Sequence, residues 1–151
     1  ALQTQQTSVV SYRQPVASVI KSMGMNYDPH ALSHYGGSPT RTDANRLRDK
    51  KSTEMLAKFI DVLKRTKEAD GSSLFDHTIL SWGTNLRHGH MIKDVPAIVA
   101  GGLPSLKMGH SIVLPEEDTP LGNLWVTLLR QAGVEVDSLG SSTGILPELL
   151  S

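Results

Sequence analysis

The sequence predicts an α/β fold in which a mostly parallel sheet is flanked by helices. Two short, continuous apolar runs at residues 77–82 and 97–100 have the composition of strands that are covered on both faces. Two longer segments, one before and one after these runs, carry apolar residues at helical spacing. The resulting order of helix, strand, strand and helix is typical of α/β proteins.

The first part of the chain is predicted to contain one long helix. Residues 1–22 are polar and are expected to form a linker or one short leading element. Residues 23–42 combine glycines, prolines and two histidines, which predicts a long irregular loop. Thr42 or Asp43 is then expected to cap a helix that runs toward Ala69.

The second part is predicted to supply the strands and a closing helix. A further hairpin is expected on either side of Gly109-His110, and the leucines of residues 121–132 predict a helix that ends at Gly133. Three or four strands make only a small sheet. We therefore expect the remainder of a longer chain, or a second chain, to complete the sheet, with a homo-oligomer as one form of this partner.

Charge and composition exclude several partners. Lys and Arg together number 15, as do Asp and Glu, so the formal net charge is zero and offers no positive field for nucleic acid or an anionic membrane. No apolar stretch reaches the roughly 18 residues that a transmembrane helix needs. The chain has no cysteine, which excludes disulfides, thiolate metal ligands and a thiol nucleophile.

Two pairs of histidines are the residues most suited to chemistry. His30 and His34 occur in DPHALSHYGG, and His88 and His90 occur in NLRHGHMIKDVP, directly after the first predicted strand. Histidine is the commonest metal ligand, and a spacing of four residues can direct two imidazoles to one cation. The alternative is that all four are polar loop residues without a ligand. Both interpretations stay open on spacing alone.

The segment DPHALSHYGG resembles the His-x-x-Ser-His-His signature of the HXXSHH family of bacterial proteins, a domain of unknown function. Later segments, among them DGSSLFDHTILSWGTN, HMIKDVPAIVAGG and the closing PLGNLWVTLLRQAGVEVDSLGSSTGIL, resemble other parts of that family in the same order. The resemblance covers residues 23–151 and implies the carboxyl-terminal part of a longer, exported protein, periplasmic or extracellular. Two positions depart from it, since Tyr35 replaces the third histidine and Leu139 replaces a phenylalanine.

The HXXSHH family in turn resembles, more remotely, the alkaline phosphatase and sulfatase superfamily. That likeness implies an alkaline-phosphatase-like sheet and one divalent metal, zinc, held by His30, His34 and His90. Thr84-Asn85 stands where the superfamily has an Asp-His pair for a second metal, so a second site is not expected. The candidate helpers are Ser33, Asn85 and His88, with Ser33 expected to orient an imidazole or, alternatively, to act as a nucleophile.

Two functions follow from the resemblance. The first is a metal-dependent hydrolase of phosphate or sulfate esters, in which the metal polarises the ester or activates water. The second is a non-catalytic extracellular binding or assembly protein, which is favoured by the altered residues Asn85 and Tyr35 and by the lack of a recognisable nucleophile in residues 1–25. The sequence leaves the choice between enzyme and assembly protein open.

Overall fold

The computed structural model describes residues 2–4, 6–84, 86–115, 117 and 119–151. The chain folds as two compact units, which we call unit 1 (Ala1–Leu74 with Thr84–Val95) and unit 2 (Phe75–Gly83 with Pro96–Ser151). Both histidine pairs therefore belong to unit 1. No helix in the described part of the chain combines the length and the apolar character needed to cross a bilayer.

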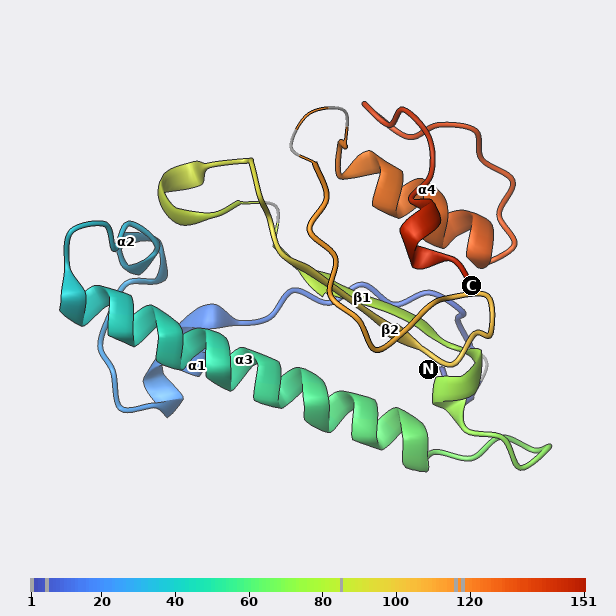
Figure 1. Cartoon of the computed structure of the whole chain (residues 1–151). Coiled ribbons are helices and arrows are strands. Elements are labelled where there is room, and N and C mark those ends of the chain that lie inside the picture. Colours follow the sequence, from blue (N-terminus) through green and yellow to red (C-terminus); the bar gives the residue numbers. More distant parts are fainter. Residues whose placement is uncertain (1, 5, 85, 116, 118) are drawn as a thin grey trace. The chain divides into compact units, whose positions relative to one another are not determined.

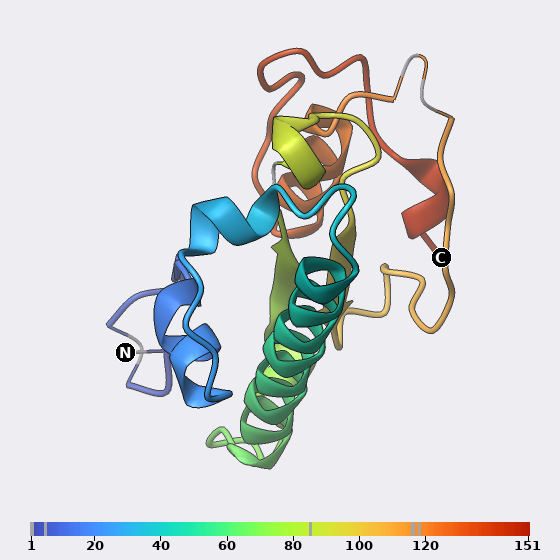
Figure 2. The same cartoon turned by 90° about the vertical axis from the view of Figure 1, so that its left-hand side faces the viewer.

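Unit 1 is helical (Figures 1 and 2). Its elements include α1 (Val16–Ser22), α2 (Pro29–Ser33), α3 (Pro39–Arg65) and the 3₁₀ turn η2 (His88–His90). Ile20 of α1, Leu32 of α2 and Ala44 of α3 are buried and form a small common core. Because helices as short as α1 and α2 are unstable alone, this core is what keeps them folded.

Two capped helix starts replace the irregular loop predicted for residues 23–42. The side chain of Asp28 accepts a backbone N–H of α2 at 2.8 Å, and that of Ser38 accepts a backbone N–H of α3 at 3.4 Å. A proline follows each cap at the first helical position, where its missing N–H leaves no hydrogen bond unmade. The predicted start of the long helix at Thr42 or Asp43 is therefore wrong.

The helix α3 also ends earlier than predicted. Its last residue is Arg65 rather than Ala69, because the backbone of Thr66 is extended (φ −75°, ψ 116°). The chain then bends back, with Lys67 paired to Ser73 in an isolated antiparallel bridge. Local pairing thus replaces the last helical turn that the sequence favours.

Unit 2 contains a two-stranded sheet, the one sheet found within the described ranges (Figure 1). The 3₁₀ turn η1 (Leu74–His77) leads into β1 (Ile79–Gly83), which pairs antiparallel with β2 (Ala97–Gly101). In the register, Ile79 lies opposite Gly101 and Gly83 lies opposite Ala97. Two strands therefore form close to the predicted positions.

The predicted parallel sheet flanked by helices is wrong. The strands run antiparallel, and the described part of the segment between them contains the 3₁₀ turn η2 instead of the helix that usually joins parallel strands. Neither strand is covered on both faces, since each contains exposed residues. The predicted alkaline-phosphatase-like architecture is wrong as well, because it requires such a parallel sheet. The prediction failed because a short apolar run indicates a strand but not the direction of the strand that pairs with it.

The predicted hairpin around Gly109-His110 is also wrong. Leu106 pairs instead with Leu150 in an isolated antiparallel bridge, and the Lys107 N–H donates to the Leu149 carbonyl at 2.8 Å. This pairing joins residues more than 40 positions apart, so local turn chemistry does not predict it.

The helix α4 (Gly122–Gln131) confirms the predicted closing helix. Its Leu124 and Leu128 form the core of unit 2 with Leu106 and Leu146. Gly133 follows the helix with φ 79°, the left-handed conformation that ends many helices. After a return segment and the 3₁₀ turn η3 (Pro147–Leu149), the chain packs back against this core.

Candidate metal centre

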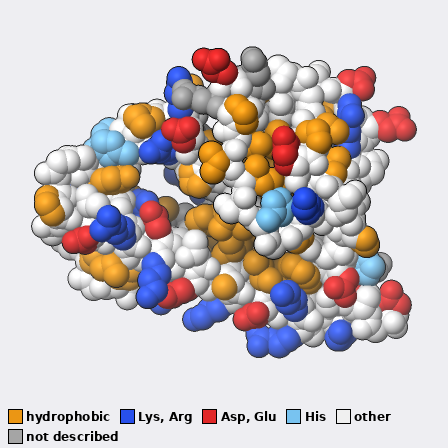
Figure 3. Space-filling view, in the orientation of Figure 1, with side chains coloured by type: hydrophobic (Ala, Val, Ile, Leu, Met, Phe, Trp, Pro, Cys, Tyr) orange, Lys and Arg blue, Asp and Glu red, His pale blue; other side chains and the backbone are white. Residues whose placement is uncertain are grey.

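Three exposed imidazoles from two distant segments converge in unit 1. The Nε2 atom of His30 lies 3.1 Å from Nε2 of His34 and 3.1 Å from Nε2 of His90. The three ring centroids lie between 4.7 and 5.1 Å apart. Figure 3 shows histidine side chains gathered at the surface over α2 and the segment that contains η2. These three residues form a cluster that could hold a metal ion.

Two of the rings are placed by α2. His30 and His34 are four residues apart, which brings side chains together on one face of a helix. His34 is the residue that ends the helix, with φ −95° and ψ 53°. Leu32, between them, is fully buried and anchors the opposite face of this short helix in the core.

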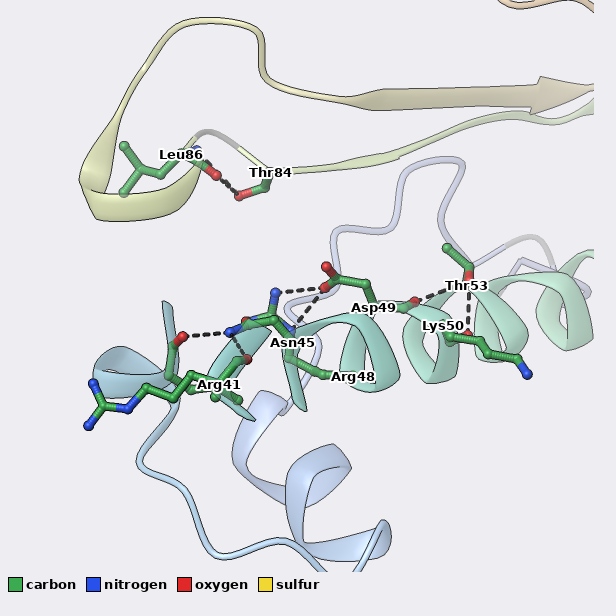
Figure 4. A network of polar contacts seen from close by, with 9 residues as sticks. Arg41, Asn45, Arg48, Asp49, Lys50, Thr53, Thr84 and Leu86 are labelled. Atoms are coloured by element: carbon green, nitrogen blue, oxygen red, sulfur yellow. Dashed lines mark hydrogen bonds and ion pairs between the residues drawn. The ribbon is translucent and has the colours of Figure 1, made fainter. Parts of the chain in front are cut away.

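Asn45 of α3 holds the carboxyl end of α2 in place (Figure 4). Its Nδ2 group donates to the carbonyl oxygen of Leu32 at 2.6 Å and to that of Arg41, in its own helix, at 3.0 Å. The side chain is buried, with 3% of its surface exposed. Because Leu32 lies two residues from each of His30 and His34, this contact fixes both rings relative to α3.

The third ring reaches the cluster on a tight loop. Gly89 and His90 both have left-handed backbone angles, with φ 61° and 67°. This conformation is natural for glycine and uncommon for other residues, although histidine tolerates it better than most. The Arg87 N–H donates to the Met91 carbonyl at 2.7 Å, and the Arg87 guanidinium pairs with the Asp94 carboxylate at 2.7 Å. These contacts close the loop around the left-handed pair.

His88 contacts the turn that follows α2 instead of the cluster. Its Nε2 accepts the backbone N–H of Gly36 at 2.8 Å. The ring of Tyr35 lies beside it, with the two centroids 4.6 Å apart. A side chain at position 36 would not fit, since a Cβ there would lie 2.7 Å from Nε2 of His88.

The geometry of the cluster suits a cation better than hydrogen bonds. The Nε2 atom of a neutral imidazole carries either one proton or one lone pair, so it makes one good hydrogen bond. His30 Nε2 nevertheless has two imidazole nitrogens at 3.1 Å. A tetrahedral Zn²⁺ bound at 2.0–2.1 Å holds its nitrogen ligands about 3.3 Å apart, close to the observed separations. One cation would therefore satisfy all three nitrogens at once.

The cluster also disfavours a bound proton. The pKa of His34 lies below the ordinary histidine value because its ring is partly desolvated and because positive charge on His90, His30 and His88 opposes protonation. A neutral imidazole is the form that binds metal. Desolvation and repulsion within the cluster thus favour neutral His34, the form that can act as a ligand.

The structure brings together His30, His34 and His90, the three ligands implied by the family resemblance, and it gives two of the predicted helpers, Ser33 and His88, other contacts. The Ser33 hydroxyl donates to the His30 carbonyl at 2.7 Å, so it orients no ring through this contact. His88 is engaged by Gly36, and Asn85 lies outside the described residues. Thr84, next to it, both donates to and accepts from the backbone of Leu86 (Figure 4).

The sequence alone does not identify two residues that support the site, Asn45 and Gly36. Asn45 looks like an ordinary polar residue of a solvated helix, and only its burial beneath α2 shows its role. Gly36 reads as one of several loop glycines. Its signal was the pair Gly36-Gly37 directly after the histidine signature, where close backbone approach is a common reason for glycine.

Comparisons with protein-family models, with curated proteins and with solved structures give no match for this chain. The resemblance to HXXSHH proteins therefore stays a prediction, as does the export that it implies. The support for a metal centre comes from the geometry of the three histidines alone.

Proposed function

We propose that this protein binds one divalent metal ion, zinc, through His30, His34 and His90, and that it is a metal-dependent hydrolase of phosphate or sulfate esters. The observation that carries the proposal is the convergence of three Nε2 atoms, with two separations of 3.1 Å, from segments 60 residues apart. A donor set of three imidazoles without thiolate suits zinc and its neighbours in the transition series rather than Mg²⁺ or Ca²⁺.

The number of ligands that the described part of the chain supplies favours catalysis over a purely structural metal. Structural zinc sites have four protein ligands, whereas catalytic sites have three and leave one position for water or substrate. Zinc in such a site lowers the pKa of its water to about 7 and so supplies a nucleophile at neutral pH. The three histidine side chains are exposed, so a substrate can approach from solvent.

A second candidate function is a non-catalytic binding or assembly protein in which the metal joins two segments of the chain. The favouring observation is that Ser33, the serine of the histidine signature, donates its hydroxyl to a backbone carbonyl. This function needs the same metal but no turnover.

Metal titration followed by an activity assay tests both functions. We expect the metal-free protein to take up one Zn²⁺ or Co²⁺ per chain, and the H30A and H90A variants to lose this uptake. H110A is the matched control, because His110 is exposed and lies outside the cluster. Full uptake by H30A and H90A would exclude the site.

Catalysis is then tested on the zinc-loaded full chain with aryl phosphate and aryl sulfate esters. Turnover that disappears in H90A but persists in H110A would support the hydrolase. Stoichiometric metal binding without turnover of either ester class would exclude the hydrolase for these substrates and favour the assembly protein.

A further inference from the structure

We propose that His88 is a positioning residue of the metal centre: it holds the loop that carries His90 against the turn after α2, and it is not a ligand. The proposal rests on the metal binding proposed above, which makes His90 a ligand. His88 and His90 lie only two residues apart in the sequence, but they have different roles in this proposal.

The lone pair of His88 Nε2 is already engaged within the protein. Nε2 of His88 accepts the Gly36 N–H at 2.8 Å, so its lone pair points at the backbone and its proton is on Nδ1. A nitrogen engaged in this way does not bind a cation at the same time. His88 is also half-buried, whereas the three clustered histidines are exposed.

The ring of His88 fits closely against the backbone of Gly36. A Cβ at position 36 would lie 2.7 Å from Nε2 and 2.8 Å from Cε1 of His88, distances that real side chains do not show. Gly36 does not have the left-handed backbone that favours glycine, so the nearby ring is the steric reason for a glycine here. The Tyr35 ring covers another side of the same imidazole.

The contact between His88 and Gly36 lies beside the proposed ligands. Gly36 follows His34 by two residues, and His88 precedes His90 by two residues. The hydrogen bond therefore joins the two ligand-bearing segments directly beside the cluster. His90 has a left-handed backbone, which costs free energy for a residue other than glycine and persists only where surrounding contacts hold it. The contact between His88 and Gly36 is one of these contacts.

The first experiment compares H88A and H88Q with the wild type by titration with Co²⁺ and by the visible absorption of the saturated proteins. We expect H88A to bind about 10–100-fold more weakly, the loss typical when a residue that orients a ligand is removed. H88Q should recover part of the affinity, because the Gln Oε1 can accept the Gly36 N–H. The absorption at saturation should match the wild type in both variants, because the ligands are unchanged.

A second experiment tests the contact itself through a double-mutant cycle. G36A should weaken Co²⁺ binding about tenfold or more, because its methyl group displaces His88. In the H88A background the same change should have little further effect, because the ring that it meets is gone. G144A is the matched control, since a Cβ at Gly144 meets nothing within 4 Å.

The outcomes separate this proposal from the proposed function. Wild-type protein that binds no metal would overturn both. Wild-type binding together with unchanged affinity in H88A would overturn only the positioning role, and an altered absorption spectrum of saturated H88A would identify His88 as a ligand. Equal cost of G36A with and without His88 would show that the contact does not act on the site.

Discussion

At the scale of single residues, the candidate metal centre depends on the protonation of its imidazoles. Folding lowers the pKa of His34, so the unfolded chain binds a proton at this residue more readily than the folded chain does. The resulting contribution to stability is complete above the unfolded pKa of about 6.5 and is lost as the pH falls below it. Acid therefore opposes both the folded site and its metal.

We expect the affinity for Zn²⁺ to be nearly constant above about pH 7.5 and to fall at lower pH, by up to about tenfold per pH unit for each proton that the metal must displace. Titrations at several pH values with a competing chelator of known affinity would measure this. The H110A variant should follow the same curve. An affinity that is equal at pH 5.5 and pH 7.5 would contradict binding through imidazoles.

Asn45 is a second residue, besides His88, whose loss should loosen the site without removing a ligand. N45A removes the donor to the Leu32 carbonyl and should lower the free energy of unfolding by about 1–3 kcal/mol, because a buried acceptor loses its partner. Chemical denaturation of the metal-free protein measures this loss. N26A is the control, because Asn26 is exposed. Equal stability of N45A and N26A would show that the contact between α2 and α3 is unimportant.

The sequence could predict part of the site at this scale. The four-residue spacing of His30 and His34 indicates a shared helix face, and α2 provides that face. His90 joins them only through the tertiary fold, because it lies 60 positions after His30. Sequence spacing does not predict a contact over that distance. The different tasks of His88 and His90 depend on the left-handed turn at Gly89, and the residue types alone do not reveal that geometry.

At the scale of elements, α4 is held by polar contacts as well as by its leucines. The Thr127 hydroxyl donates to the Asn123 carbonyl at 2.7 Å and accepts the Leu146 N–H at 2.8 Å, and Thr127 is almost fully buried. The Asn123 Oδ1 accepts the Thr143 N–H at 2.7 Å. These contacts attach the return segment to the helix that it crosses.

We expect T127V to lower the free energy of unfolding by about 1–3 kcal/mol, because the change keeps the volume of the side chain but leaves the buried Leu146 N–H without an acceptor. T40V is the matched control on α3, where Thr40 is exposed. Equilibrium unfolding in urea would measure both. A cost for T127V no larger than that for T40V would mean that packing alone holds the return segment.

Helices were more predictable than the sheet. The leucine spacing and Gly133 predicted α4, and caps and prolines contain enough information to place the starts of α2 and α3 once both signals are considered together. The apolar runs predicted β1 and β2 but not their antiparallel pairing. The pairing of Leu106 with Leu150 depends on the tertiary fold, which no local pattern encodes.

At the scale of the whole molecule, metal binding should act on one unit. All three proposed ligands lie in unit 1, with His90 on the segment Thr84–Val95. A ligand that binds the folded state stabilises it by about 2.7 kcal/mol at 100 times its dissociation constant. Local opening of the segments that carry the ligands should therefore become rarer, while the core of unit 2 gains no direct contact.

Hydrogen exchange with and without Zn²⁺ tests this localisation. We expect slower exchange in α2 and in the described residues of the segment 84–95, and little change in α4. H90A should show no zinc-dependent change in either unit. Protection that is as large in α4 as in α2 would contradict a site confined to unit 1.

The separation of His30 and His90 by 60 positions also has a consequence for protein synthesis. A ribosome that has released only the first 74 residues of this chain has delivered two of the three imidazoles, so the nascent segment can chelate a metal only weakly. At about 5–20 residues per second, the third imidazole follows His30 after roughly 3–12 s. All three proposed ligands are thus present only late in translation, after α3 has had time to form.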